Sequence, residues 1–235
     1  MQINNVRIYG LEESIIASGF PMLNKELTNA DFEKQVYELK HLLKNKKFIQ
    51  DFINYQDNYN KFKTKEDSIS FKNSIKHYKR ILKLANAPVG SGHDAALKGI
   101  VVQFNCHAPQ YFWQQLQRYH FIDIISSMSK MHRINKMGLT DACMKETNYE
   151  AIYNANEAIN YYDAGEIDID SVLANIPMGL EYTARLTTNY LQLKTIYKQR
   201  KNHRSNQWKV FCEWIKTLPL AEELIINEDS TSQKL

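Results

Sequence analysis

The chain has 235 residues, of which 43% are hydrophobic and 24% charged, with only 8 glycines and 5 prolines. So high an apolar share excludes a disordered chain, and so little glycine and proline excludes a fibrous or low-complexity one. The 30 Lys and Arg residues outnumber the 26 Asp and Glu residues, which gives a formal net charge of +4. This modest excess suits anionic ligands but is weaker than a dedicated nucleic-acid-binding protein shows, so nucleic acid is not the expected partner.

Targeting and redox signals favour a cytoplasmic protein. No uncharged apolar run approaches the roughly 20 residues that a membrane span needs, and the N-terminus lacks the basic and apolar regions of a secretory signal. The three cysteines are scattered and the seven histidines are dispersed, which argues against a disulfide framework and against a metal site. The length predicts one domain over residues 1–226, followed by a frayed polar tail at 227–235.

The N-terminal part is predicted to contain one short strand and several helices. The predicted elements are a strand at residues 6–9 and helices at 11–18, 29–45 and 71–85. Gly10 closes the strand, and either Thr28 or Asn29 caps the second helix. The stretch 44–65 is rich in Lys, Asn, Asp and Tyr, a composition compatible with a helix followed by a connector.

The rest of the chain is predicted to combine strands with longer helices. The predicted elements are a largely buried strand at 100–106, a helix from Ala108-Pro109, a second apolar run at 121–125, and helices at 141–170, 181–201 and from Ser205 onward. Proline suits the first position of a helix, and the segment 88–92 and Pro177 mark breaks. Helices dominate over a few strands, so the class is α+β or helix-rich α/β.

Two candidate sites lie in the middle of the chain. His93 follows a Gly-Ser-Gly break, where an ordinary polar role is the more common case. Residues 114–120 place glutamines, Arg118 and His120 among aromatic residues. They form either the edge of an amphipathic helix or an anion site in which Arg118 forks onto a phosphate or carboxylate.

Two further candidates are rich in cations. Residues 126–133 combine three serines with Lys130, His132 and Arg133; these could cradle a phosphate or form a plain polar turn, and no GxxxxGKS pattern makes them a P-loop. In the run 194–204, Lys201 and Arg204 are expected to be solvated at a helix end, where the dipole favours cations. Arg200 lies on a mixed face and is the better functional candidate.

The spacing of these positions resembles that of the flavin-dependent thymidylate synthase family. Gln115-Leu-Gln-Arg118 looks like the family's Q-x-x-R motif, and the strand at 100–106 precedes it at the expected place. The other positions at similar spacing are His93, Ala108-Pro109, Pro177, Asn189, Arg200 and Asn206-Gln-Trp-Lys-Val. The resemblance covers roughly residues 88–216 and depends on agreement between two distant blocks.

This resemblance implies a fold, a reaction and an assembly. The fold would be α+β and helix-rich, with a mixed sheet flanked by helices. The reaction would convert dUMP to dTMP with a methylene carbon from methylenetetrahydrofolate, while FAD relays reducing equivalents from NADPH. The protein would form a homotetramer with sites shared between subunits.

The resemblance also implies roles for individual residues. The catalytic residues would be Arg200, Ser127 and Ser129. The residues that bind the pyrimidine nucleotide would be Gln115, Arg118, Lys130 and Arg200, with Arg200 near the pyrimidine carbonyl. The residues that contact FAD would be His93, Tyr119, His120 and Asn189.

Several positions depart from the family pattern. The motif R-H-R is here Arg118-Tyr119-His120, and the serine expected ten residues after Arg118 is Met128, between Ser127 and Ser129. Leu173 and Leu191 stand where the family has arginines. Two hypotheses follow, an active or altered flavin enzyme and a homologue that binds or sequesters a nucleotide without flavin chemistry. A third, binding of RNA or a protein through the 194–204 face, is disfavoured by the modest charge.

Overall fold

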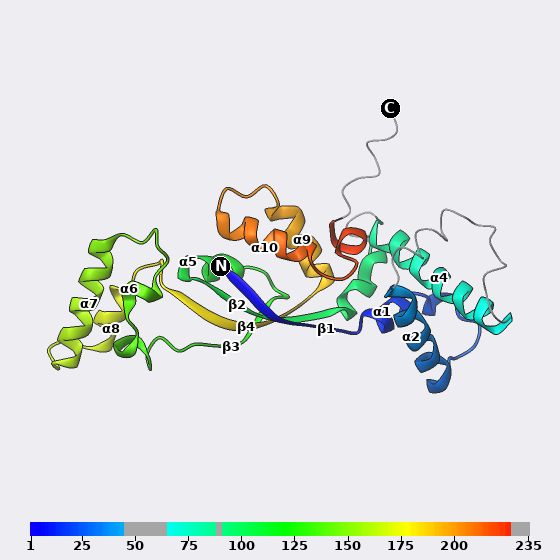
Figure 1. Cartoon of the computed structure of the whole chain (residues 1–235), viewed down its shortest axis with the longest axis horizontal. Coiled ribbons are helices and arrows are strands. Elements are labelled where there is room, and N and C mark those ends of the chain that lie inside the picture. The colour runs from blue at the N-terminus through cyan, green and yellow to red at the C-terminus, as the bar shows by residue number, and fades with distance from the viewer. Residues whose placement is uncertain (45–64, 88–90, 227–235) are drawn as a thin grey trace, which may run out of the picture. The chain divides into compact units, whose positions relative to one another are not determined.

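The computed structural model describes residues 1–44, 65–87 and 91–226, with only the backbone described at 65–70 (Figure 1). The helices and strands are β1 (Gln2–Tyr9), α1 (Leu11–Ala17), η1 (Phe20–Met22), α2 (Asn29–Leu43), α4 (Lys65–Ala85), η3 (His93–Gly99), β2 (Val101–Pro109), α5 (Gln110–Leu116), β3 (Asp123–Ser127), η4 (Ile134–Lys136), α6 (Leu139–Ala142), α7 (Tyr149–Asp163), α8 (Ile169–Ala174), β4 (Glu181–Asn189), α9 (Tyr190–Arg200), α10 (Asn206–Lys216) and η5 (Glu222–Ile226). The predicted connector after residue 44, part of the break at 88–92 and the C-terminal tail lie outside the described residues. None of the described helices is both long and apolar enough to cross a bilayer.

The chain divides into two compact units. The first, here called the sheet unit, comprises Met1–Arg7, Val102–Thr188 and Ile196–Thr217. The second, here called the helical unit, takes in the other described residues. The single domain expected from the length stays a prediction.

The four strands form an antiparallel sheet in the order β1-β2-β4-β3. Side chains of β2 alternate between buried and half-buried, and the buried set is Val102, Phe104, Cys106 and Ala108. Helix α10 packs on this face, because the ring of Phe104 lies 4.4 Å from that of Trp214. Helix α5 does the same through Trp113, which stacks on Tyr182 of β4 at 5.4 Å. The sheet therefore holds α5 and α10 over one face, where they position the site.

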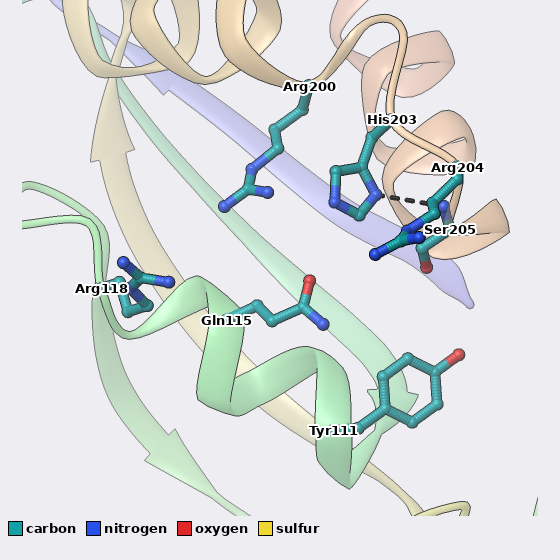
Figure 2. Close-up of a pocket in the computed structure, with 7 residues that line it drawn as sticks. All are labelled: Tyr111, Gln115, Arg118, Arg200, His203, Arg204 and Ser205. Carbon is teal, nitrogen blue, oxygen red and sulfur yellow. Dashed lines mark hydrogen bonds between the residues drawn. The ribbon is translucent and has the colours of Figure 1, made fainter.

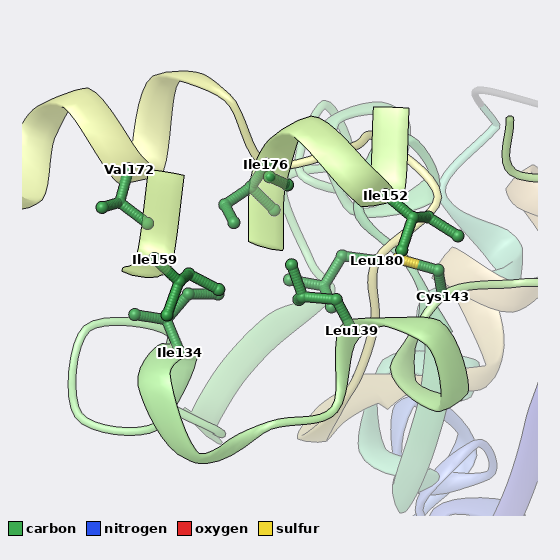
Figure 3. Close-up of a cluster of buried hydrophobic side chains, with 9 residues drawn as sticks. Ile134, Leu139, Cys143, Ile152, Ile159, Val172, Ile176 and Leu180 are labelled. Atoms are coloured by element: carbon green, nitrogen blue, oxygen red, sulfur yellow. The ribbon is translucent and has the colours of Figure 1, made fainter. Parts of the chain in front are cut away.

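A separate hydrophobic cluster lies within the sheet unit, between β3 and β4 in sequence (Figure 3). Its side chains come from η4, α6, α7 and α8, from the residue after α6, and from the segment before β4. The members are Ile134, Leu139, Cys143, Ile152, Ala155, Ile159, Val172, Ile176 and Leu180. Asn148 and Asp168 cap α7 and α8 by accepting backbone N–H groups. The segment 134–180 therefore has a core of its own.

The helical unit packs α1, α2, α4 and η3 around buried aliphatic side chains such as Ile15, Leu39 and Ile81. Gly10 has a φ of +70°, and a Cβ there would lie 2.6 Å from the carbonyl oxygen of Gly99. The turn after β1 therefore requires glycine both for its backbone conformation and for the close approach of η3.

All three cysteines are buried in the sheet unit. Burial raises the pKa of the Cys106 thiol to about 12 and that of Cys212 to about 11, and it also raises the pKa of Cys143. Each thiol is therefore held in its protonated, unreactive form.

The predicted α+β class is confirmed, as are α1, the Thr28 cap of α2, and α10. The predicted helix over 181–201 is wrong in its first half, because residues 181–189 form β4. Threonines and alternating burial of Ala184, Leu186 and Thr188 suit a strand with one face on the core. The sheet is antiparallel rather than mixed.

Two other boundaries differ from the prediction. The segment predicted as one helix over 141–170 is divided among α6, α7 and α8, since Gly165 at a φ of +76° ends α7. Pro109 is not the first helical residue but the extended N-cap of α5, at the end of a longer strand β2. Strand β1 likewise begins at Gln2, earlier than the alternation at 6–9 indicated.

Candidate functional site

A pocket of about 520 Å³ opens on the sheet unit, between α5 and the turn that joins α9 to α10 (Figure 2). It is lined by Tyr111, Gln115, Arg118, Arg200, His203, Arg204 and Ser205. Three of these seven side chains are guanidinium groups and none is a carboxylate. The volume is in the range of small-ligand sites in proteins.

Helix α5 positions one wall of the pocket. Phe112, Trp113 and Leu116 are buried in the core of the unit. The opposite face of the helix therefore carries Tyr111 and Gln115, which are four residues apart and lie one above the other. Arg118 follows in the turn after the helix and is exposed, so its guanidinium extends over the pocket (Figure 2).

Arg200, the last residue of α9, is held by Tyr119 and Trp208. Its Nε donates a hydrogen bond to the hydroxyl oxygen of Tyr119 at 2.7 Å, and that hydroxyl donates in turn to Gln199 at 3.0 Å. Its guanidinium carbon lies 4.6 Å from the ring centre of Trp208 and 5.6 Å from that of Tyr119. These cation–π contacts fix the charge in place, and Figure 2 shows its terminal nitrogens directed toward Arg118.

Trp208 also fixes the amide of Gln115. Its indole Nε1 donates to Gln115 Oε1 at 2.7 Å. Because an indole nitrogen can only donate, the accepting atom is the amide oxygen. The amide NH₂ group of Gln115 is therefore the part left to face a ligand in the pocket.

The turn between α9 and α10 forms the other wall. The backbone N–H of Ser205 donates to His203 Nδ1 at 3.1 Å, so Nε2 carries the ring hydrogen in the neutral imidazole. Loss of hydration, followed by the charges of Arg200 and Arg204, lowers the pKa of His203 below its usual value. His203 is thus a neutral donor at pH 7, and Arg204 beside it is a cation.

The structure brings together part of the predicted site. Gln115, Arg118 and Arg200, expected from the motifs to bind the nucleotide, line one pocket. Arg118 and Arg200 line this pocket within a single chain, whereas the resemblance implies sites shared between subunits. Tyr119 accepts a hydrogen bond from Arg200 Nε, and His120 is exposed in the turn after α5.

The pocket also contains Tyr111 and Ser205, which the sequence did not single out, and His203, which belongs to the cationic run 194–204. Arg204 was expected to be a solvated helix-end cation, but it lines the pocket. The sequence does carry a signal here. The five residues 201–205, between the helix that ends in Arg200 and the helix that carries the buried Trp208, are all polar, and three of them are basic.

Three other predicted residues do not line this pocket. Lys130 donates from Nζ to Gln110 Oε1 at 3.0 Å and lies 5.9 Å from the ring centre of Tyr182. Ser127 is exposed at the end of β3, and Ser129 Oγ accepts the backbone N–H of His132 at 3.4 Å. Their catalytic and substrate-binding roles stay predictions.

Two of the four side chains predicted to contact FAD have their polar atoms engaged within the chain, and the role of all four stays a prediction. Asn189 uses its Oδ1 to accept the backbone N–H of Gln192 in the first turn of α9, and the Tyr119 hydroxyl already makes two hydrogen bonds. His93 is exposed at the start of η3. None of these four side chains is a permanent cation, and Leu173 and Leu191 have apolar side chains. Nor do His, Cys, Asp or Glu side chains in the described ranges gather in threes to hold a metal ion.

Comparisons with known proteins establish the fold alone. No protein-family model and no curated protein matches the chain. Thymidylate Synthase X (ThyX) from Helicobacter pylori, crystallised with FAD and dUMP, matches at a TM-score of 0.52 and 13% identity over 64% of this chain and 81% of that chain. A second structure of flavin-dependent ThyX from Helicobacter pylori, complexed with FAD and dUMP, matches at 0.54 and 12% over 80% and 92%.

A third match adds nothing on fold. The UMP/dUMP methylase PolB from Streptomyces cacaoi, bound with 5-Br UMP, has 15% identity over 66% of this chain and 84% of that chain, but its TM-score is 0.47. The two ThyX structures suffice. The chain has a helix-rich α+β fold of the kind seen in flavin-dependent thymidylate synthase, as the sequence resemblance implied.

Proposed function

We propose that this ThyX-like protein binds a pyrimidine nucleotide in the pocket of Figure 2 and holds its phosphate between Arg118 and Arg200. One observation carries the proposal. Two guanidinium groups, supplied by the turn after α5 and by the end of α9, line one pocket with no lining carboxylate, and Figure 2 shows that of Arg200 directed toward Arg118. Like charges so placed repel unless an anion lies between them, and a phosphate accepts hydrogen bonds from both forks.

Each residue has a defined part in this binding. Arg118 and Arg200 neutralise the phosphate, and the amide NH₂ of Gln115 donates to an acceptor oxygen of the ligand. Tyr119 and Trp208 hold Arg200 by a hydrogen bond and a cation–π contact, so its charge needs no rearrangement when the ligand binds. Such preorganised donors are the main way in which proteins stabilise developing negative charge.

The proposed reaction is transfer of a one-carbon unit from methylenetetrahydrofolate to dUMP or a related pyrimidine nucleotide. FAD, when bound, would relay reducing equivalents from NADPH. The ThyX fold and the paired arginines support this reaction, and the cytoplasmic location and the homotetramer with shared sites are proposed with it.

A second candidate is a nucleotide-binding or sequestering protein without flavin chemistry. The side chains expected to contact flavin favour it, because Asn189 and Tyr119 have their polar atoms engaged within the chain. Leu173 and Leu191 favour it too, since neither can bind a phosphate. Both candidates require the pocket to bind a nucleotide, so that is the first test.

Isothermal titration calorimetry with dUMP tests the binding. Arg118→Gln should weaken dUMP binding by about tenfold or more, because a hydrogen bond between charged groups is worth roughly 1.5–3 kcal/mol. Arg7→Gln is the matched control, since Arg7 is also an exposed arginine of the sheet unit and lies outside the pocket. Equal affinities for the two variants, or no dUMP binding by the unmodified protein, would contradict the proposed site.

Absorbance and turnover then separate the two candidates. Flavin bands in the purified protein, together with tritium release from 5-tritiated dUMP when FAD, NADPH and methylenetetrahydrofolate are supplied, would establish the methyltransferase. Tight dUMP binding with neither flavin uptake nor tritium release would establish the binding protein.

A further inference from the structure

The nucleotide proposal uses Gln115, Arg118 and Arg200. The wall formed by His203, Arg204 and Ser205 has no role in it, although these three residues line the same pocket. In Figure 2, His203 and Arg204 lie on the side of the pocket away from Arg118, with Gln115 between the two groups.

Hydrogen-bond chemistry shows what this second wall selects. The side-chain groups offered by Gln115, Arg118, Arg200 and Arg204 are donors, because the amide oxygen of Gln115 is already engaged by Trp208. His203 is also a donor, since its Nδ1 accepts from Ser205 and its Nε2 carries the hydrogen. A ligand that fills the pocket must therefore supply acceptors along most of its length.

Charge points to the same conclusion. The pocket has three permanent positive charges, on Arg118, Arg200 and Arg204, and no acidic lining residue. A phosphate monoester carries at most about two negative charges near neutral pH, and a second phosphate adds about one more. Ser205 lies at the N-cap of the 11-residue helix α10, but its side chain does not cap that helix, so the positive helix end adds to the field on this side.

We infer that the pocket binds a diphosphate group, with one phosphate between Arg118 and Arg200 and the second on Arg204 and the Nε2–H of His203. The inference rests on the proposed function for the first phosphate and adds a second phosphate subsite to it. A diphosphate can come from a pyrimidine nucleoside diphosphate, or from a dinucleotide cofactor that would take the place of the nucleotide phosphate. The two sources share the chemistry that this wall recognises.

Equilibrium dialysis of the full chain against radiolabelled inorganic phosphate and pyrophosphate, at constant pH and ionic strength, tests the subsite. Pyrophosphate should bind about tenfold or more tightly than phosphate, the effect of one added charged contact. Arg204→Gln should remove most of that preference and leave phosphate affinity within about threefold. Arg7→Gln, the same change outside the pocket, should behave as the unmodified protein does.

The outcomes separate this inference from the proposed function. If Arg204→Gln leaves the pyrophosphate preference intact, or weakens both anions equally, the second subsite is overturned even where dUMP binding depends on Arg118. If the preference depends on Arg204 but dUMP does not bind, the subsite stands and the proposed function fails.

Competition identifies the source of the diphosphate. Displacement of labelled pyrophosphate by dUDP at a lower concentration than by dUMP would indicate a nucleoside diphosphate, and displacement by FAD would indicate a cofactor. Failure of both to displace it would overturn the inference.

Discussion

One buried side chain, Trp208, orients two of the residues that face the pocket. Its indole N–H fixes the amide of Gln115, and its ring face carries the guanidinium of Arg200. Trp208 belongs to α10 and is fully buried in the core of the sheet unit. These two contacts therefore depend on how the core of the unit packs. The affinity of the pocket is therefore sensitive to a residue that does not line it.

Trp208→Phe should separate the two contacts. Phenylalanine keeps an aromatic face for Arg200 but removes the donor to Gln115, so dUMP affinity should fall about fivefold, in line with the loss of roughly one hydrogen bond. Trp113→Phe is the matched control, because Trp113 is equally buried and its indole donates to the backbone oxygen of Ala108 at 3.0 Å.

Both variants should lose about 1–3 kcal/mol of unfolding free energy in urea, as smaller rings leave space in a packed core. Only Trp208→Phe should also change the dUMP affinity measured by calorimetry. Identical affinities for the two variants would show that the amide of Gln115 makes no contact with the nucleotide.

Among the elements, helices with strong end signals were predictable, and the strand β4 was not. The Thr28 cap and the buried face of α10 have local sequence signals, and the structure confirms both. β4 runs directly into α9, with Asn189 capping the helix, so no glycine or proline separates them. The predicted helix therefore wrongly includes residues 181–189, because the strands that pair with them, β2 and β3, lie far away in the sequence.

At the same scale, His77 joins two helices of the helical unit in its neutral form. Arg80 donates to His77 Nδ1 at 3.1 Å, so Nε2 carries the hydrogen and donates to Gln35 of α2 at 3.0 Å. Burial, followed by the charges of Arg80 and Lys76, lowers the pKa of His77 to about 4. Protonation would place a second cation against Arg80 and remove an acceptor.

The consequence is a pH-dependent stability. The pKa of His77 is about 4 in the folded chain and 6.5 for an ordinary histidine, so the unfolded chain binds more protons between these values. Stability from this group is fully present above pH 6.5 and is lost as the pH falls from 6.5 toward 4, by up to about 1.4 kcal/mol per pH unit.

Urea unfolding followed between pH 7 and pH 4.5 checks this linkage. His77→Gln should flatten the pH dependence of the unfolding free energy in this window. His132→Gln, a change at an exposed histidine, should leave the dependence as it is. An equally steep dependence in both variants would assign the effect to other groups.

For the whole molecule, the sequence predicted the fold class and the pairing of two distant motifs, but not the full pocket. Gln115, Arg118 and Arg200 lie in one pocket because both motif blocks belong to the sheet unit. That His203, Arg204 and Ser205 line the pocket could not be predicted, since a turn has no periodicity and cations at a helix end usually face water. The pairing of the strands and the separate core of residues 134–180 both depend on contacts between residues far apart in the sequence. No local sequence pattern encodes such contacts.

Because all three cysteines are buried, the rate at which a thiol reagent labels them reports how often the protein unfolds. Every thiol belongs to the sheet unit and is kept protonated by its surroundings, and the chain has no fourth cysteine. An alkylating reagent such as iodoacetamide should therefore leave the native chain unmodified and add three adducts in urea, counted by intact mass. Nucleotides that bind the pocket should slow the labelling in proportion to the stability they add, so ligands can be ranked without any engineered probe.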